Sequence, residues 1–243
     1  MQTKYLEKES ILTECLNLLR QRQLPLVKEK LGNYFNNLKK NEANLFFQGL
    51  SDFTNNNFES AIGNFKQIIP LQPNDIESLK AIALCHFHLN QLQQCLNICQ
   101  QLLSLKENDY EIYYQIALVY ERQNLLEEAQ KYFFKTISLN TNHIESIFKS
   151  ISISNYTKDT QNAKLLLEKA KTLIPYSYLF KEEIHYLLNI DKENEAILIY
   201  QKKCKNKKTK EESLLILINY LIKNRQLDRA ESLFLNEKIE TNE

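Results

Sequence analysis

Apolar residues recur along the chain with the spacing of amphipathic helices. The segment 110–143 shows the pattern most clearly, because it contains two such helices in succession. Its first half places apolar side chains at i, i+3, i+4 and i+7: Tyr113, Ile116, Ala117 and Tyr120. Its second half places them at i, i+3 and i+7: Leu126, Ala129 and Phe133. Both patterns have the helical period, so they predict a helix–turn–helix unit.

A small residue recurs at one position in the second helix of each unit. The residues at this position are Val27, Ala61, Cys95, Ala129, Ala163, Ala196 and Ala230, separated by 34, 34, 34, 34, 33 and 34. A constant period of this length is typical of a solenoid, in which each unit packs only on its neighbours. Where two helices cross, a small side chain lets their backbones approach closely.

The residues at the other recurring positions resemble the tetratricopeptide family. In 42–75 the large, small and aromatic positions and the helix-stopping proline of that family are all in phase: Leu45, Gly49, Ala61, Phe65 and Pro73. In 144–177 the matching residues are Ile147, Ile151, Ala163, Leu167, Ala170 and Pro175. The resemblance covers 42–75, 76–109, 110–143 and 144–177 clearly, while 8–41, 178–210 and 211–243 are more divergent.

This resemblance implies an all-α fold, a right-handed α-solenoid of about seven repeats and about 14 helices. We expect residues 1–243 to form one superhelical domain. Only 3 Gly and 4 Pro occur in 243 residues, which fits helices far better than a protein rich in β-turns.

Bulk composition excludes several other classes of protein. The net charge of +1 gives no reason to expect a nucleic acid or a membrane partner. Met1 to Arg20 does not resemble a signal peptide, and the longest aliphatic run, Leu214 to Ile218, is too short to span a bilayer. Five cysteines without regular spacing suit a reducing compartment, so we expect a cytoplasmic protein. We interpret the Lys-rich segment 202–210 as an exposed link between two repeats.

No catalytic, metal or cofactor site is predicted. The chain has no Gly-rich phosphate loop, His-Glu-x-x-His motif or nucleophile elbow, so we expect no enzyme activity and no cofactor. The sequence around His86 and His88 offers Cys85, Cys95 and Cys99 as metal ligands. In repeat phase, however, Cys95 and Cys99 lie between helices, where cysteine acts as a small apolar residue. We therefore predict a core role for these cysteines and no metal.

A binding surface follows from the family resemblance. In tetratricopeptide proteins the first helix of each repeat lines the concave face. Transfer of those positions gives a predicted groove, which we call the ladder: Phe46, Leu50, Phe53, Lys80, Leu84, Phe87, Tyr114, Leu118, Phe148 and Tyr156. Chaperone-binding members hold a terminal carboxylate with Asn at the position that Leu50, Leu84 and Leu118 occupy here. The tails of heat-shock chaperones are therefore not the expected partners.

The predicted function is that of a non-catalytic adaptor or scaffold, which binds an apolar peptide or an amphipathic helix in this groove. Residues 42–109 carry 3 basic and 7 acidic side chains, so a partner with basic flanks is favoured. Segment 211–223 is apolar on nearly every face, which predicts a further contact through the C-terminal repeat. Two alternatives stay open: a structural subunit of a large assembly, and an array that binds RNA as pentatricopeptide proteins do.

Overall fold

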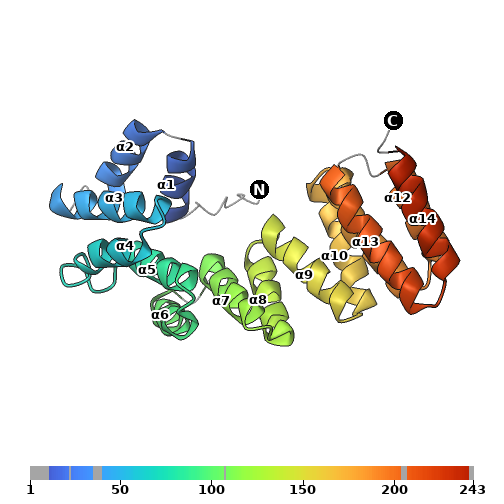
Figure 1. Cartoon of the computed structure of the whole chain (residues 1–243). Coiled ribbons are helices and arrows are strands. Elements are labelled where there is room, and N and C mark those ends of the chain that lie inside the picture. Colours follow the sequence, from blue (N-terminus) through green and yellow to red (C-terminus); the bar gives the residue numbers. More distant parts are fainter. Residues whose placement is uncertain (1–10, 22, 35–39, 107, 204–206, 241–243) are drawn as a thin grey trace, which may run out of the picture. The chain divides into compact units, whose positions relative to one another are not determined.

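The computed structural model describes residues 11–21, 23–34, 40–106, 108–203 and 207–240 (Figure 1). These residues contain fourteen α-helices, one 3-10 turn and no strand, which confirms the predicted all-α helical repeat array. The elements are α1 (Ile11–Arg20), α2 (Leu24–Tyr34), α3 (Lys40–Thr54), α4 (Phe58–Lys66), α5 (Ile76–His88), α6 (Leu92–Leu105), α7 (Tyr110–Arg122), α8 (Leu126–Leu139), α9 (Ile144–Tyr156), α10 (Thr160–Leu173), η1 (Tyr176–Tyr178), α11 (Phe180–Asn189), α12 (Glu193–Lys203), α13 (Lys207–Lys223) and α14 (Leu227–Glu240).

The chain divides into two compact units. Unit 1 is Met1–Tyr132 and unit 2 is Phe133–Glu243, so the division falls within α8. Consecutive helices pack on each other inside both units, as in α3 with α4 and α9 with α10. The expectation of one continuous superhelical domain concerns the arrangement of the two units, and it stays a prediction.

The recurring small position is buried in every repeat. Val27, Ala61, Cys95, Ala129, Ala163 and Ala196 are completely inaccessible to solvent, and Ala230 is 6% exposed. Gly49 of α3 shows how tight such a crossing is, because a Cβ atom built on it would lie 2.6 Å from the ring of Phe65. Phe65 is itself fully buried, so only glycine fits opposite it.

The turns between paired helices also repeat with the same period. In six of these turns one described residue has a positive φ, and the members of this set are Asn56, Asn90, Asn124, Lys158, Asp191 and Arg225. In the first of them the amide of Asn57 donates to the carbonyl of Asp52 (2.9 Å) and the amide of Asn56 donates to that of Phe53 (3.0 Å). The other five turns have the same two bonds. This is the Schellman motif, which satisfies the last carbonyls of a helix and usually contains glycine. Asparagine or a charged residue takes that place here, so six turns form in a chain that has only 3 glycines.

Candidate functional site

The ladder residues of α3 lie in the core of unit 1. Phe46 and Leu50 are completely buried, and the ring of Phe46 packs edge to face on that of Phe65 with centroids 5.2 Å apart. Phe53 is half-buried in the same cluster. Phe46 and Leu50 are therefore covered in this conformation of the chain, and Phe53 is covered in part.

The helix α1 contributes to that cover. Its residues Leu12, Cys15 and Leu16 follow the spacing i, i+3 and i+4, and they belong to the same buried cluster as Phe46 and Leu50. In sequence order α1 is the first helix of the first repeat, which would pack only on neighbouring helices. It packs on its neighbours α2 and α3, as expected. It also packs on α5, which lies two repeats further along the chain. An amphipathic helix thus already lies against the first helices of unit 1.

Acidic side chains hold the N-terminal end of α1. The backbone amide of Leu12 donates to Oε2 of Glu77 at 2.9 Å, and the hydroxyl of Thr13 donates to Oε1 of Glu111 at 3.2 Å. The first turn of a helix has free amides and partial positive charge, so a carboxylate stabilises it. Glu77 is 8% exposed, and this burial raises the pKa of its carboxyl group above the ordinary value.

Lys80 of α5, the one basic residue of the predicted ladder, is part of a buried ion-pair network. Its Nζ lies 2.6 Å from Asp109, the N-cap of α7, and 2.7 Å from Glu111 in the first turn of that helix. Burial alone would lower the pKa of Lys80, but the charges of Glu111 and Asp109 outweigh it and raise the pKa. Lys80 therefore remains charged and joins α5 to α7, while Asp109 also caps α7 by accepting from the amide of Glu111.

Towards the C-terminal end of α5 the ladder residues are less completely buried than those of α3. Phe87 is 9% exposed, and the guanidinium of Arg122 lies over its ring at 3.9 Å from the centroid. The same Arg122 donates to the carbonyl oxygen of Phe87 at 2.7 Å. Three further ladder residues of unit 1, Leu84, Tyr114 and Leu118, are half-buried. These half-buried side chains, with Phe53, are the part of the ladder in unit 1 that is partly accessible to solvent.

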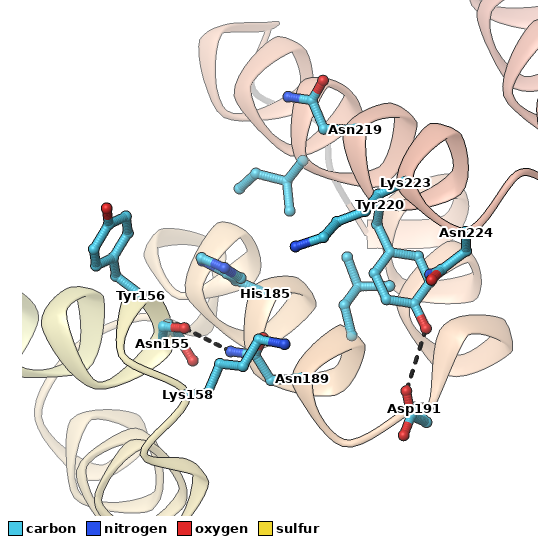
Figure 2. Close-up of a pocket in the computed structure, with 12 residues that line it drawn as sticks. Asn155, Tyr156, Lys158, His185, Asn189, Asp191, Asn219, Tyr220, Lys223 and Asn224 are labelled. Carbon is cyan, nitrogen blue, oxygen red and sulfur yellow. Dashed lines mark hydrogen bonds between the residues drawn. The ribbon is translucent and has the colours of Figure 1, made fainter.

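The two ladder residues of unit 2 have different surroundings. Phe148 of α9 packs against the buried cluster around Ile147 and Ile151 and is half-buried. Tyr156, at the end of α9, is 72% exposed. It lines a pocket of about 540 Å³ formed by α9, α11 and α13, all within unit 2 (Figure 2).

Polar side chains line most of this pocket, which we call the unit 2 pocket. Its other polar residues are Asn155, Lys158, His185, Asn189, Asp191, Asn219, Tyr220, Lys223 and Asn224, and its apolar ones are Leu188 and Ile216. Asn189 donates to the carbonyl of Asn155 at 2.7 Å, which fixes α11 against the end of α9. Burial and then the charge of Lys181 lower the pKa of His185, so its ring is neutral at pH 7.

Tyr156 is the one member of the predicted ladder in this pocket. The pocket residues from His185 onwards were missed, because the transfer of family positions stopped at 144–177. One signal could have found them. Continued at the repeat interval, the position of Leu118 in unit 1 gives Ser152, His185 and Asn219, separated by 33 and 34 residues. The first-helix face thus changes from leucine to polar residues along the sequence.

The described residues were also compared with the requirements of a metal site. They contain no group of three or more His, Cys, Asp or Glu side chains arranged to hold a metal ion. Cys85, Cys95 and Cys99 are buried free thiols, in agreement with the predicted core role. Within the same described ranges, none of the helices combines the length and the apolar character needed to cross a membrane.

Two further predictions concern the C-terminal repeat. In α14, Leu227, Phe234 and Leu235 are 62%, 44% and 49% exposed. A contact through this repeat stays a prediction. Most side chains of the Lys-rich segment 202–210 lie outside the described residues.

Comparisons with known proteins found one matching family model and several similar solved structures. Residues 54–136 match the model of the family described as anaphase-promoting complex, cyclosome, subunit 3. Among solved structures, PilF of Pseudomonas aeruginosa is similar with a TM-score of 0.62 and 17% identity, over 82% of this chain and 91% of that one. A tetratricopeptide repeat protein from Parabacteroides merdae has a TM-score of 0.57 and 13% identity, over 94% and 91%. The crystal structure of MamA has a TM-score of 0.56 and 16% identity, over 69% and 93%. No curated protein sequence matches the chain significantly.

The buried small positions, the six repeated turns and these structural similarities agree with one another. The chain has the fold of tetratricopeptide-repeat proteins, an all-α array of paired helices. A fold does not by itself imply a function, so the function has to be argued from the residues of this chain.

Proposed function

We propose that this protein is a non-catalytic adaptor that holds an amphipathic helix of a partner protein on the first helices of unit 1. The observation that carries the proposal is α1, which is itself an amphipathic helix lying on α3 and α5. Its contacts support a ligand of the same chemistry, with apolar side chains at i, i+3 and i+4 and a helix N-terminus facing Glu77. Partner helices are commonly recognised through such spaced apolar anchors.

The same contact implies competition between α1 and the partner. Phe46 and Leu50 are completely buried in the cluster that includes α1, whereas Leu84 and Leu118 are half-exposed with α1 in place. The carboxylates of Glu77 and Glu111 favour a partner with positive charge near the start of its helix. The groove residues of unit 1 are therefore proposed as the binding surface, with α1 as its resident occupant.

A partner-free experiment tests this proposal. A fluorescein-labelled synthetic peptide with the sequence of residues 11–21 serves as the probe. We expect it to bind the variant Leu12→Asp with Leu16→Asp, because two buried charges make the chain's own α1 leave the surface. Binding to the unmodified protein should be weaker by about tenfold or more, since an occupied site lowers the apparent affinity. Equal binding to both proteins, with helical circular dichroism unchanged, would sink the proposal.

Cys15 gives an independent readout of the position of α1. Its thiol is completely buried, and this burial raises the pKa of Cys15 to about 11. A thiol in such surroundings reacts slowly with iodoacetamide, because the thiolate is the reactive form. We expect the Leu12→Asp, Leu16→Asp variant to label faster at Cys15, with labelling of Cys99, which lies in a different buried cluster, unchanged as an internal control. Peptide mapping by mass spectrometry separates the two sites.

A second pair of substitutions tests the half-exposed part of the surface. Leu84→Asp with Leu118→Asp should abolish partner capture in a pull-down while leaving helical circular dichroism intact. Unchanged capture by this variant would remove the groove from the proposal. The two alternatives separate in other assays: a structural subunit shows extensive buried surface in purified complexes, and an RNA-binding array shows salt-dependent filter binding.

We also propose that the protein works in a reducing compartment, the cytoplasm. Four described cysteines are free and buried, which supports this location.

A further inference from the structure

The last repeat of unit 2 exposes apolar side chains at positions that earlier repeats bury. Phe234 of α14 is 44% exposed. The residues at the same repeat position, at intervals of 34, 34, 34, 33 and 34, are at most 3% exposed: Phe65, Cys99, Phe133, Leu167 and Tyr200. Ile222 of α13 is 50% exposed, whereas its counterparts Leu188 and Asn155 are buried. Two positions of the repeat core are therefore open to solvent in this repeat.

In earlier repeats the first helix of the next repeat covers these positions. Leu188 of α11 and Tyr200 of α12 share a buried cluster with Leu217 of α13, and α13 packs on both helices. Among the residues that the structure describes, no helix of unit 2 follows α14 to cover the last repeat in this way. We call the resulting surface the end face, and its apolar members are Leu215, Ile218, Ile222, Leu227 and Phe234.

The helix α13 has apolar residues on several sides, and the end face uses the side that unit 2 leaves uncovered. The side buried in unit 2 carries Leu214, Leu217 and Leu221. A second side, with Ile216 and Tyr220, lines the unit 2 pocket. The remaining side carries Leu215, Ile218 and Ile222, which follow i, i+3 and i+7. This stripe covers two helical turns, so it can pack along another helix.

Charged residues of opposite sign lie at the two ends of this stripe. Glu211 precedes Leu215 by four residues, and Arg225 follows Ile222 by three. Both are exposed, and within the described ranges neither forms an ion pair. An antiparallel copy of α13 would place Glu211 of each chain opposite Arg225 of the other. The stripe is thus complementary to itself in charge as well as in polarity, which favours a second copy over an unrelated partner.

We infer that the end face binds a second copy of this chain, with the two α13 helices antiparallel about a two-fold axis near Ile218. Leu215 of each copy then packs on Ile222 of the other, and burial of this apolar surface drives the association. Both copies use the same patch, so the contact closes as a dimer and does not propagate. The interface lies at the end of unit 2 and is independent of the helix-binding surface in unit 1.

Sedimentation velocity on the full-length protein over a range of concentrations tests the inference. We expect a monomer at about 1 μM and a dimer at about 200 μM, because small interfaces give weak association. Leu215→Asp with Ile222→Asp should weaken dimerisation by about 100-fold or more, since the charges would have to be buried between the copies. Both side chains are exposed in the single chain, so circular dichroism should stay unchanged. The matched control is Leu165→Asp with Leu198→Asp, two exposed leucines of α10 and α12 outside the end face, with an expected change of less than about twofold.

Exchange of the two charges tests the antiparallel orientation. Glu211→Arg alone, or Arg225→Glu alone, should weaken dimerisation about fivefold, and the double variant should restore it to within about twofold. Four results would overturn the inference: a monomer at every concentration, equal losses in the end-face and control pairs, no recovery in the double charge variant, or a mass that grows beyond the dimer. The last would indicate a head-to-tail contact between different surfaces.

Discussion

The two units have the same backbone plan, but the faces formed by their first helices differ in polarity. In unit 1 this face is a set of Phe and Leu side chains, and α1 covers part of it. In unit 2 the corresponding face ends in an open, polar pocket. The buried small residues and the Schellman turns are common to both. The interval of 33 or 34 residues therefore fixes how helices pair, whereas the positions that point away from the pair differ between the two units.

Lysine illustrates this contrast best. Lys80 of unit 1 is 8% exposed and lies between two carboxylates, so its charge joins α5 to α7. Lys158 and Lys223 of unit 2 are exposed and line a pocket. The first is part of the structure of its unit, and the other two are available to a ligand.

The largest expected effect comes from removal of the buried lysine. Lys80→Met leaves Asp109 and Glu111 without their shared cation, and loss of one partner from a buried network costs about 4 kcal/mol of unfolding free energy. Lys223→Met removes an exposed charge and should change stability by less than about 0.5 kcal/mol. Urea denaturation followed by circular dichroism measures both. A similar small effect in the two variants would show that Lys80 is not structurally distinct from the lysines of unit 2.

The next largest effect concerns one repeat position that holds a small residue in unit 1 and a large residue in unit 2. Gly49 of unit 1 faces the large ring of Phe65, whereas its counterpart in unit 2, Ile151, lies in a cluster with the smaller Leu167. Alanine, the usual family residue, should therefore suit neither site. We expect Ile151→Ala to cost about 3 kcal/mol through a cavity, and Gly49→Ala to cost about 1–2 kcal/mol through overpacking.

The control for this pair is Gly63→Ala on the exposed face of α4. A Cβ atom there meets nothing within 4 Å, so the helix should gain up to about 1 kcal/mol. Urea midpoints of the three variants decide the outcome. If Gly49→Ala also stabilised the protein, the close approach of α3 to Phe65 would not be the reason for that glycine.

The sequence predicted the features that depend on local periodicity. The buried positions of Ala61 and Ala163 follow from a constant interval and helical spacing, and they hold regardless of the partner or of distant contacts. The place of α1 could not be predicted in this way. Its bond from Leu12 to Glu77 joins residues 65 apart in the chain, and the repeat pattern predicts contacts only between neighbours. The unit 2 pocket was missed because its first helices, α11 and α13, lie in the two divergent repeats 178–210 and 211–243.

The smallest effect distinguishes the turns of the two units. Unit 1 has asparagine at every positive-φ position, Asn56, Asn90 and Asn124, while unit 2 has Lys158, Asp191 and Arg225. A residue other than glycine or asparagine costs about 1–2 kcal/mol in the left-handed conformation, and glycine loses part of this advantage through its greater freedom in the unfolded chain. Arg225→Gly should therefore stabilise the protein by about 0.5–1 kcal/mol. Asn90→Gly should change stability by less than about 0.5 kcal/mol, because asparagine already tolerates this conformation. Thermal unfolding measures both variants. Destabilisation by Arg225→Gly would mean that the arginine side chain contributes more to its turn than its backbone conformation costs.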